Sequence, residues 1–292
     1  MAVGCRRDHF DRLGLSPCIF DEFRTSQTFD GAARVLWYTA RRFLNVATPD
    51  KHQQVYVDIL FPMAGQGARF GHTFKPFLTI GDTTFIEAAV EPFRRVASQI
   101  SRFVFVYLET QERDFQVSDR LATMFAGLPI TCVRLDSPTS GPAETIARGV
   151  EKSGTTGPAF LCDCDHSLEV DGLFARATSG ARWDAILPVW PLEGENLASW
   201  SVAMVDVGRV SAIAEKQVPT GGHGTPMGVI GCYGFRDIGQ TVERAATLKA
   251  TNFSDVLKTM IASDEVVDAV RIERARFFGD PERLAKVTRG SV

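Results

Sequence analysis

The feature that most constrains the fold is a regular alternation of strand-like and helix-like segments that begins near residue 55. Short apolar runs alternate with longer amphipathic stretches in the first half of the chain, with strands expected at 57–62, 102–108, 130–135 and 159–164 and helices at 84–98, 114–125 and 142–152. This pattern predicts an α/β fold in which helices sandwich a mostly parallel mixed sheet.

The second half of the chain continues as strands separated by longer insertions. Strands are expected at 184–189, 200–205, 210–214, 227–235 and 266–272, with a helix at 253–263. Residues 1–54 do not fit the alternation, although 31–46 has a helical pattern. We therefore expect a partly helical N-terminal extension, 1–54, and one α/β domain, 55–292. The extension is either a docking or oligomerisation arm or an accessory, poorly ordered terminus.

Charge and hydropathy exclude several classes of partner. The formal net charge is only -3, so no general attraction to nucleic acid is expected. No stretch approaches the roughly 20 apolar residues of a membrane span, and charged residues interrupt the N-terminal segment where a secretory leader would be apolar. A cytoplasmic protein is the resulting expectation.

The six cysteines are scattered and do not form a disulfide framework. Cys162, Cys164 and His166 alternate along one extended segment, but no second ligand cluster is present to close a tetrahedral zinc site. Buried small side chains are the preferred interpretation.

The most informative motif follows the first expected strand. Ala64, Gly65 and Gly67 form a glycine-rich loop, and Arg69 and Lys75 follow it. Closely spaced glycines let the backbone approach a triphosphate, and the two cations supply fixed positive charge. The motif lacks the third glycine of a dinucleotide fingerprint and the Gly-Lys-Ser/Thr of a P-loop. A glycine pair alone could be an ordinary tight turn.

A pair of carboxylates follows the strand expected at 159–164. Asp163 and Asp165 are two residues apart on an extended segment, so both can face one way and share Mg²⁺. The alternative is a pair of turn or capping aspartates.

Three further positions are candidates for substrate contact. Gly141 opens the expected helix at 142–152, where free N–H groups and a bare backbone give access to a planar base. Glu215 and Lys216 could bind sugar hydroxyls and an acceptor phosphate, although adjacent surface charges are often only solvated. Gly228 could allow close backbone approach to a sugar.

Together these motifs resemble the sugar-phosphate nucleotidyltransferase family, in the branch found in bacterial polysaccharide gene clusters. The resemblance covers about 57–287. It includes the Gly-x-Gly-x-Arg-Phe loop with Lys-Pro, the acidic pair, the Glu-Lys pair with the Gly-x-Tyr-x-Phe strand at 231–235, and the closing turn at 278–282. It implies a glycosyltransferase-A-like, Rossmann-like nucleotide-binding fold.

The resemblance also implies residue roles. Arg69 and Lys75 would neutralise the triphosphate in the transition state, and Asp165 would be the principal Mg²⁺ ligand with Asp163 beside it. Two departures stand out: Ala68 replaces the usual Ser or Thr, and Phe277 stands where many members carry a second metal-binding aspartate.

The expected function is Mg²⁺-dependent transfer of a nucleotidyl group from an NTP to a sugar phosphate, with release of pyrophosphate. One alternative is a glycosyltransferase of related fold that uses a nucleotide-sugar donor. Another is a non-catalytic protein that binds nucleotides or sugar phosphates. The sequence does not decide the base, the sugar or the oligomeric state, and a homo-oligomer is compatible with it.

Overall fold

The computed structural model describes residues 55–65, 67, 70–71 and 73–288. The predicted extension at 1–54 lies outside these residues, so its boundary and role stay predictions. Within the described part of the chain, no helix combines the length and the apolar character that crossing a membrane requires.

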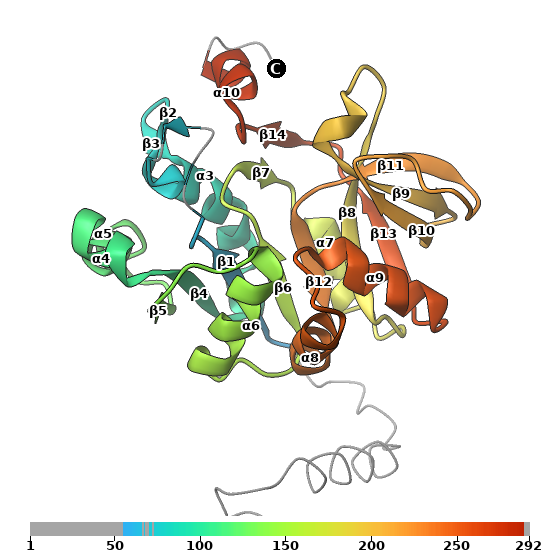
Figure 1. Cartoon of the computed structure of the whole chain (residues 1–292), viewed down its shortest axis with the longest axis horizontal. Coiled ribbons are helices and arrows are strands. Elements are labelled where there is room, and N and C mark those ends of the chain that lie inside the picture. The colour runs from blue at the N-terminus through green and yellow to red at the C-terminus, as the bar shows by residue number, and fades with distance from the viewer. Residues whose placement is uncertain (1–54, 66, 68–69, 72, 289–292) are drawn as a thin grey trace, which may run out of the picture. The chain divides into compact units, whose positions relative to one another are not determined.

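A ten-stranded sheet forms the centre of the domain, in the order β11-β9-β10-β13-β8-β12-β6-β1-β4-β5 (Figure 1). In one half, β6, β1, β4 and β5 all run parallel, as the alternating strands and helices predict. Two small sheets pair β14 with β7 and β2 with β3. The strands are β1 Val57–Pro62, β2 Thr79–Ile80, β3 Thr83–Thr84, β4 Ile100–Leu108, β5 Ile130–Leu135, β6 Ala159–Cys162, β7 His166–Leu168, β8 Ala185–Pro191, β9 Ser201–Asp206, β10 Arg209–Glu215, β11 Thr225–Val229, β12 Cys232–Phe235, β13 Val267–Arg271 and β14 Ala275–Phe277.

The other half of the sheet is mainly antiparallel, so the prediction of a mostly parallel sheet is not confirmed. Only β13 and β8 run parallel there, and β11 pairs with both β9 and β8, which closes the strands β8, β11, β9, β10 and β13 into a ring of pairings. The reason is local. Val207 and Gly208 connect β9 to β10 with φ of 44° and 74°, a two-residue loop of the kind that joins antiparallel neighbours.

Helices cover both faces of the sheet, which confirms the sandwich. On β1, Ile59 and Phe61 face one core while Leu60 faces the other, as the period of two requires. The first core includes α3, η4, α5 and α7, and the second includes α6, α8 and α9. The helices are η3 Lys75–Phe77, α3 Phe85–Val90, η4 Glu91–Gln99, α4 Glu109–Phe115, α5 Val117–Met124, α6 Pro142–Ser153, α7 Asp171–Ala177, η5 Leu197–Ser199, α8 Ile238–Leu248, α9 Phe253–Ala262 and α10 Pro281–Thr288.

Three expected elements are interrupted. The helix expected at 84–98 passes from α3 into the tighter η4 at Glu91–Pro92, because proline lacks the N–H that an α-helix interior needs. Gln116, with φ of 52°, separates α4 from α5. The strand expected at 227–235 divides into β11 and β12 around Ile230 and Gly231.

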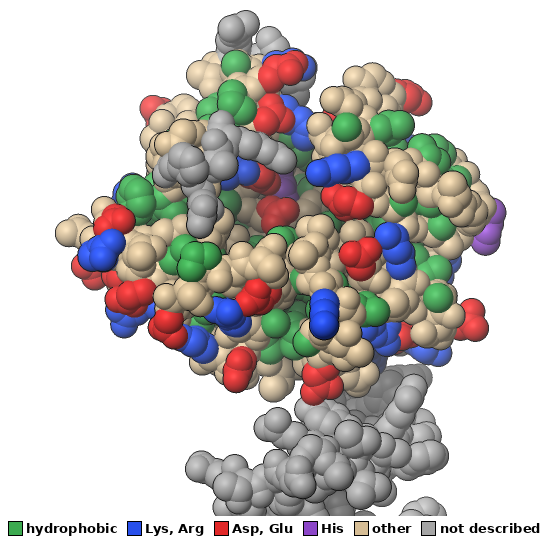
Figure 2. Space-filling model, viewed as in Figure 1, with side chains coloured by type: hydrophobic (Ala, Val, Ile, Leu, Met, Phe, Trp, Pro, Cys, Tyr) green, Lys and Arg blue, Asp and Glu red, His purple; other side chains and the backbone are tan. Residues whose placement is uncertain are grey.

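The surface of the domain mixes both signs of charge. Acidic and basic side chains are interspersed over the face shown in Figure 2, and acidic side chains lie in the hollow near its centre. In the ribbon drawn from the same side, β7 lies at the place of this hollow (Figure 1).

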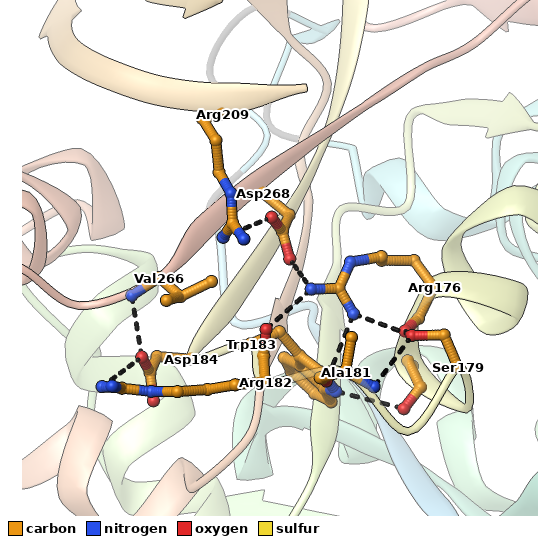
Figure 3. Close-up of polar contacts among 10 residues, drawn as sticks. Arg176, Ser179, Ala181, Arg182, Trp183, Asp184, Arg209, Val266 and Asp268 are labelled. Atoms are coloured by element: carbon orange, nitrogen blue, oxygen red, sulfur yellow. Dashed lines mark hydrogen bonds and ion pairs between the residues drawn. The ribbon is translucent and has the colours of Figure 1, made fainter. Parts of the chain in front are cut away.

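An ion network centred on the buried Asp268 joins strands that share few backbone hydrogen bonds (Figure 3). β10 and β13 pair at one position only, Arg209 opposite Asp268. The Asp268 carboxylate binds the Arg209 guanidinium at 2.7 Å and also pairs with Arg176 of α7. Burial raises the pKa of Asp268 despite both arginines. The network therefore ties α7 and β10 to β13 through side chains.

Candidate active site

A cavity of about 640 Å³ lies where the carboxyl ends of β1 and β6 approach the end of β10. Asp163 and Asp165 line it, and so do Glu215 and Lys216, although about fifty residues separate the two pairs in sequence. The structure thus brings four of the predicted site residues to one cavity. Carboxyl ends of parallel strands in α/β sheets are the usual location of ligand sites.

The acidic pair is placed by the end of β6. The Asp163 N–H donates to the Gly231 carbonyl at 2.7 Å, which fixes the start of the turn, and the Asp165 carbonyl accepts from the Phe278 N–H at 3.0 Å. Burial and the neighbouring Asp165 carboxylate raise the pKa of Asp163 to about 6. The two carboxylates are therefore close enough to repel one another, which a shared cation would relieve.

Lys75 forms an ion pair with Asp165, with 2.5 Å between Lys75 Nζ and Asp165 Oδ2. It is the first residue of η3, which Pro76 helps to start. Burial alone would lower the pKa of Lys75, but the Asp165 and Asp163 carboxylates outweigh it and raise this pKa. Burial would raise the pKa of Asp165, but His166 and Lys75 hold it below the usual range. Two predicted catalytic residues are thus in direct contact.

The residues present fit a divalent metal ion. Two glycines pack against the acidic pair: a side chain on Gly231 would collide with the Asp163 carboxylate, and one on Gly279 would place Cβ 2.6 Å from Asp165 Oδ2. Within the described residues no group of three His, Cys, Asp or Glu side chains could hold a metal ion. Mg²⁺ usually binds one or two carboxylates together with substrate phosphates rather than a complete protein cage, so two carboxylates suit it.

Phe277 has no atom that could bind a metal ion. Its aromatic ring lines the cavity. It pairs with His166 across β14 and β7, and its ring packs edge-on against Trp190 at 5.5 Å and Trp200 at 5.1 Å. The position that often carries a second metal-binding aspartate is therefore part of an aromatic cluster.

The described cysteines are free thiols, and two of them face each other across neighbouring strands instead of gathering with His166. Cys162 Sγ lies 2.7 Å from Cys232 Sγ, directly opposite on β12, and both are buried. His166 is also buried, and its Nδ1 lies 3.4 Å from Asp165 Oδ1 while Nε2 has no hydrogen-bond partner. Cys162 thus has a partner on the neighbouring strand, and His166 is directed to the carboxylate.

The glycine-rich loop is partly described. Ala64 is buried, and the Gly65 carbonyl accepts from Gln111 Nε2 at 3.0 Å. Gly67 has φ of 62°, and a side chain there would collide with the Thr73 carbonyl, so the loop requires glycine at this position. Arg69 lies outside the described residues, so its role stays a prediction.

Two predicted glycines have a packing role. Gly141 precedes α6, and a Cβ there would lie 2.6 Å from the Thr251 carbonyl oxygen. Gly228 lies on β11, and a Cβ there would lie 2.6 Å from the Trp200 ring. Neither glycine lines the cavity. Gly228 instead leaves room for the indole that does.

The Glu215–Lys216 pair occupies the end of β10. Glu215 Oε2 accepts from Ser201 Oγ at 2.5 Å, and the Lys216 N–H donates to the Trp200 carbonyl at 2.9 Å. Lys216 has φ of 58°, a left-handed conformation that costs energy for a residue with a side chain. Lys216 is exposed at the cavity wall, so its ammonium is accessible to a ligand there, and its role stays a prediction.

Several residues that line the cavity were not among the predicted site residues. Tyr233 belongs to the Gly-x-Tyr-x-Phe strand, and burial together with Asp163 raises its pKa. Trp200 and Ser201 are neighbours at the start of β9, whereas Arg283 lies far away in sequence on α10, so the two segments meet only in the folded chain. Only the Tyr233 motif could have been found from the sequence.

The sequence profile of the MobA-like NTP transferase domain matches residues 60–216, just over half of the chain. No curated protein matches the chain significantly. Many solved structures are similar to it.

Three of these structures illustrate the similarity. A nucleoside-diphosphate-sugar pyrophosphorylase from Vibrio cholerae RC9 is 20% identical, with a TM-score of 0.64 over 79% of this chain and 99% of that one. The inositol-1-phosphate CTP transferase from T. maritima is 15% identical, with a TM-score of 0.63 over 82% and 99% of the two chains. A UDP-glucose pyrophosphorylase from Acinetobacter baumannii is 16% identical, with a TM-score of 0.63 over 80% and 92%.

At these identities the solved structures establish the fold, and the profile match establishes the family. The fold is the mixed α/β arrangement described above. The chain belongs to the MobA-like NTP transferase family and is a nucleotidyltransferase.

Proposed function

We propose that this enzyme joins an NTP to a sugar phosphate, in a Mg²⁺-dependent reaction that yields a nucleotide sugar and pyrophosphate. The observation that carries the proposal is the single cavity that Asp163 and Asp165 share with Glu215 and Lys216. Such a cavity can hold a nucleotide triphosphate at the carboxylates and a phosphorylated acceptor at the Glu-Lys pair. The names of the similar structures, two nucleotide-sugar pyrophosphorylases and an inositol-1-phosphate CTP transferase, support this class of acceptor.

In the proposed reaction an acceptor phosphate oxygen attacks the α-phosphorus in line. The new O–P bond forms as the bond to the bridging oxygen breaks, and pyrophosphate leaves. When bound, Mg²⁺ would neutralise charge on the phosphates. Asp165 and Asp163 would hold it, and Lys75, which pairs with Asp165, is close enough to exchange that contact for a phosphate oxygen. Lys216 would meet the acceptor phosphate.

The chain's main contribution is positioning and charge neutralisation, as in phosphoryl transfer generally. Arg69 is assigned to the triphosphate by its motif. Gly65 is exposed, with open space where its side chain would be, so backbone of the glycine-rich loop is available to a ligand. The resemblance to polysaccharide-cluster enzymes favours a product used in polysaccharide synthesis.

The test is pyrophosphate release across the four NTPs with a panel of sugar 1-phosphates, with and without Mg²⁺. We expect release that requires one NTP, one acceptor class and the metal ion. Transfer or hydrolysis of a nucleotide sugar without any pyrophosphate release would favour the glycosyltransferase alternative. Binding of substrates without turnover in any combination would contradict the proposal.

A further inference from the structure

Arg283 is the centre of a cluster at the acceptor end of the cavity. Its guanidinium carbon lies 5.1 Å from the Trp200 ring centre and 5.4 Å from that of Phe277. Arg283 Nη2 donates to Glu195 Oε2 at 3.0 Å, and the same oxygen accepts from Trp200 Nε1 at 3.1 Å. One guanidinium therefore joins α10, β14 and the segment that leads into β9.

This cluster contacts Lys216, the residue with a left-handed backbone at the end of β10. Trp200 is buried, and its backbone carbonyl accepts the Lys216 N–H at 2.9 Å. Lys216 has φ of 58°, so its backbone needs such support to keep a costly conformation. Holding Trp200 in place thus holds Lys216 in place.

The cluster also reaches the metal-binding end. Asp280 caps α10 by accepting the Arg283 N–H at 2.9 Å, and the preceding Gly279 packs against the Asp165 carboxylate. The segment 277–283 therefore touches Asp165 at one side and Trp200 at the other.

We infer that Arg283 is a positioning residue that determines how the acceptor binds, by clamping Trp200, and through it Lys216, at a fixed place relative to Asp165. The inference rests on the proposed function. The clamp consists of Arg283, Glu195, Trp200 and Phe277. The aromatic residue at position 277 is then part of the acceptor wall, where relatives of the resembled family often carry an aspartate.

The charges around Arg283 argue against direct binding of the acceptor phosphate. Glu195 at 3.0 Å and Asp280 at 3.6 Å compensate the charge of the guanidinium, and its carbon lies within 5.4 Å of the centres of two aromatic rings. By contrast, in the described part of the chain no carboxylate forms an ion pair with Lys216. Lys216 is therefore the cation available to the acceptor, and Arg283 acts through Trp200.

A guanidinium is required for this arrangement. Arginine is planar, so it can stack on aromatic rings while its edge donates to a carboxylate, whereas a lysine ammonium is a compact charge without a flat face. Lysine at 283 should therefore fail to restore the clamp even though it keeps the charge.

The test compares steady-state kinetics of the full-length wild type with Arg283→Ala, Arg283→Lys and Glu195→Gln. The acceptor is varied at saturating NTP, and the NTP at saturating acceptor. Losing the clamp should raise KM for the acceptor about tenfold or more and leave KM for the NTP within about twofold, because misplacement near 1 Å has effects of this size or larger. The effects of Arg283→Ala and Glu195→Gln should not add in the double variant.

The control is Arg274→Ala, which removes an exposed ion pair with Glu169 just before β14 and should leave both KM values unchanged. Thermal unfolding of each variant separates misfolding from repositioning. Wild-type acceptor KM in Arg283→Ala, full rescue by Arg283→Lys, or equal rises in both KM values would overturn the clamp and leave the proposed function standing. Absence of wild-type turnover with every acceptor would overturn both.

Discussion

The two halves of the sheet place their functional groups by different means. In the parallel half, β1 and β6 end at the same edge, so the topology brings Lys75 and Asp165 into contact from segments ninety residues apart. In the antiparallel half, Lys216 reaches the cavity because a strained backbone turn and a side-chain clamp hold it there. The proposed nucleotide end thus depends on backbone architecture, whereas the proposed acceptor end depends on particular side chains.

The largest effect should come from the parallel half. Asp165→Asn removes the principal carboxylate and the partner of Lys75, so we expect at least a 10²–10³-fold loss in turnover, about 2.7–4 kcal/mol. Asp163→Asn should be milder and partly rescued by more Mg²⁺, because we propose that side chain as the secondary ligand. Initial rates measured over a range of Mg²⁺ concentrations give the effect of each variant, and circular dichroism confirms that each variant is folded. Small and equal effects would mean that the two aspartates only shape a turn.

The next effect concerns stability in the antiparallel half. Asp268→Asn leaves Arg176 and Arg209 facing a neutral amide where the ladder between β10 and β13 is thin. We expect the free energy of unfolding to fall by about 1.5 kcal/mol, the size of a lost charge-assisted hydrogen bond, because Asp268 is buried but Arg209 is half exposed. The control is Asp136→Asn, an exposed partner of Lys152, with an expected change below about 0.5 kcal/mol. Denaturant unfolding measures both. A loss no larger than that of the control would mean the network does not tie these strands together.

Two lysines have a left-handed backbone conformation, and replacing each in turn separates an effect on activity from an effect on backbone strain. Lys216 (φ 58°) borders the cavity, and Lys249 (φ 51°) follows α8 outside it. Glycine at either position relieves strain of about 1 kcal/mol and loses a similar backbone entropy, so stability should change little. Lys216→Gly should lower kcat/KM for the acceptor about tenfold or more, because a charge contact is lost. Lys249→Gly should keep wild-type kinetics. Equal kinetics in the two variants would mean that Lys216 is only a turn residue.

The smallest effect concerns the two-residue loop that connects β9 to β10. Val207 is 95% exposed with φ of 44°, a conformation in which a β-branched residue is strained and asparagine is tolerated. Val207→Asn should raise the free energy of unfolding by about 1 kcal/mol without changing the kinetics. Denaturant midpoints of the two proteins provide the check. A lower midpoint would show that this turn is not strained.

The sequence predicted the parallel half well because its signals are local. The strand at 57–62 and the helix start at Pro142 are found where expected, since an apolar run and an N-terminal proline act over a few residues. Asp163 and Asp165 line one cavity, as expected of two residues in one short motif, and their role as metal ligands stays a prediction.

The antiparallel half was predicted less completely, because its arrangement depends on distant partners. The expected strand at 227–235 is divided where Gly231 turns against Asp163, which is far away in sequence. Arg283 of α10 forms one cluster with Glu195 and Trp200 of the distant connection between β8 and β9, and none of the three belongs to a recognisable motif. Such contacts follow from packing of the whole chain rather than from periodicity or spacing.

The central claim is that both ends of the cavity serve one nucleotidyl transfer. Incubating the enzyme with Mg²⁺, an NTP labelled with ³²P at the α-position and a sugar 1-phosphate tests it most directly. The account predicts that the α-label enters a new product in equal amount to the pyrophosphate released, and only when both substrates are present. Transfer of a γ-label to the acceptor, or retention of the α-label in unreacted NTP with every acceptor, would contradict it.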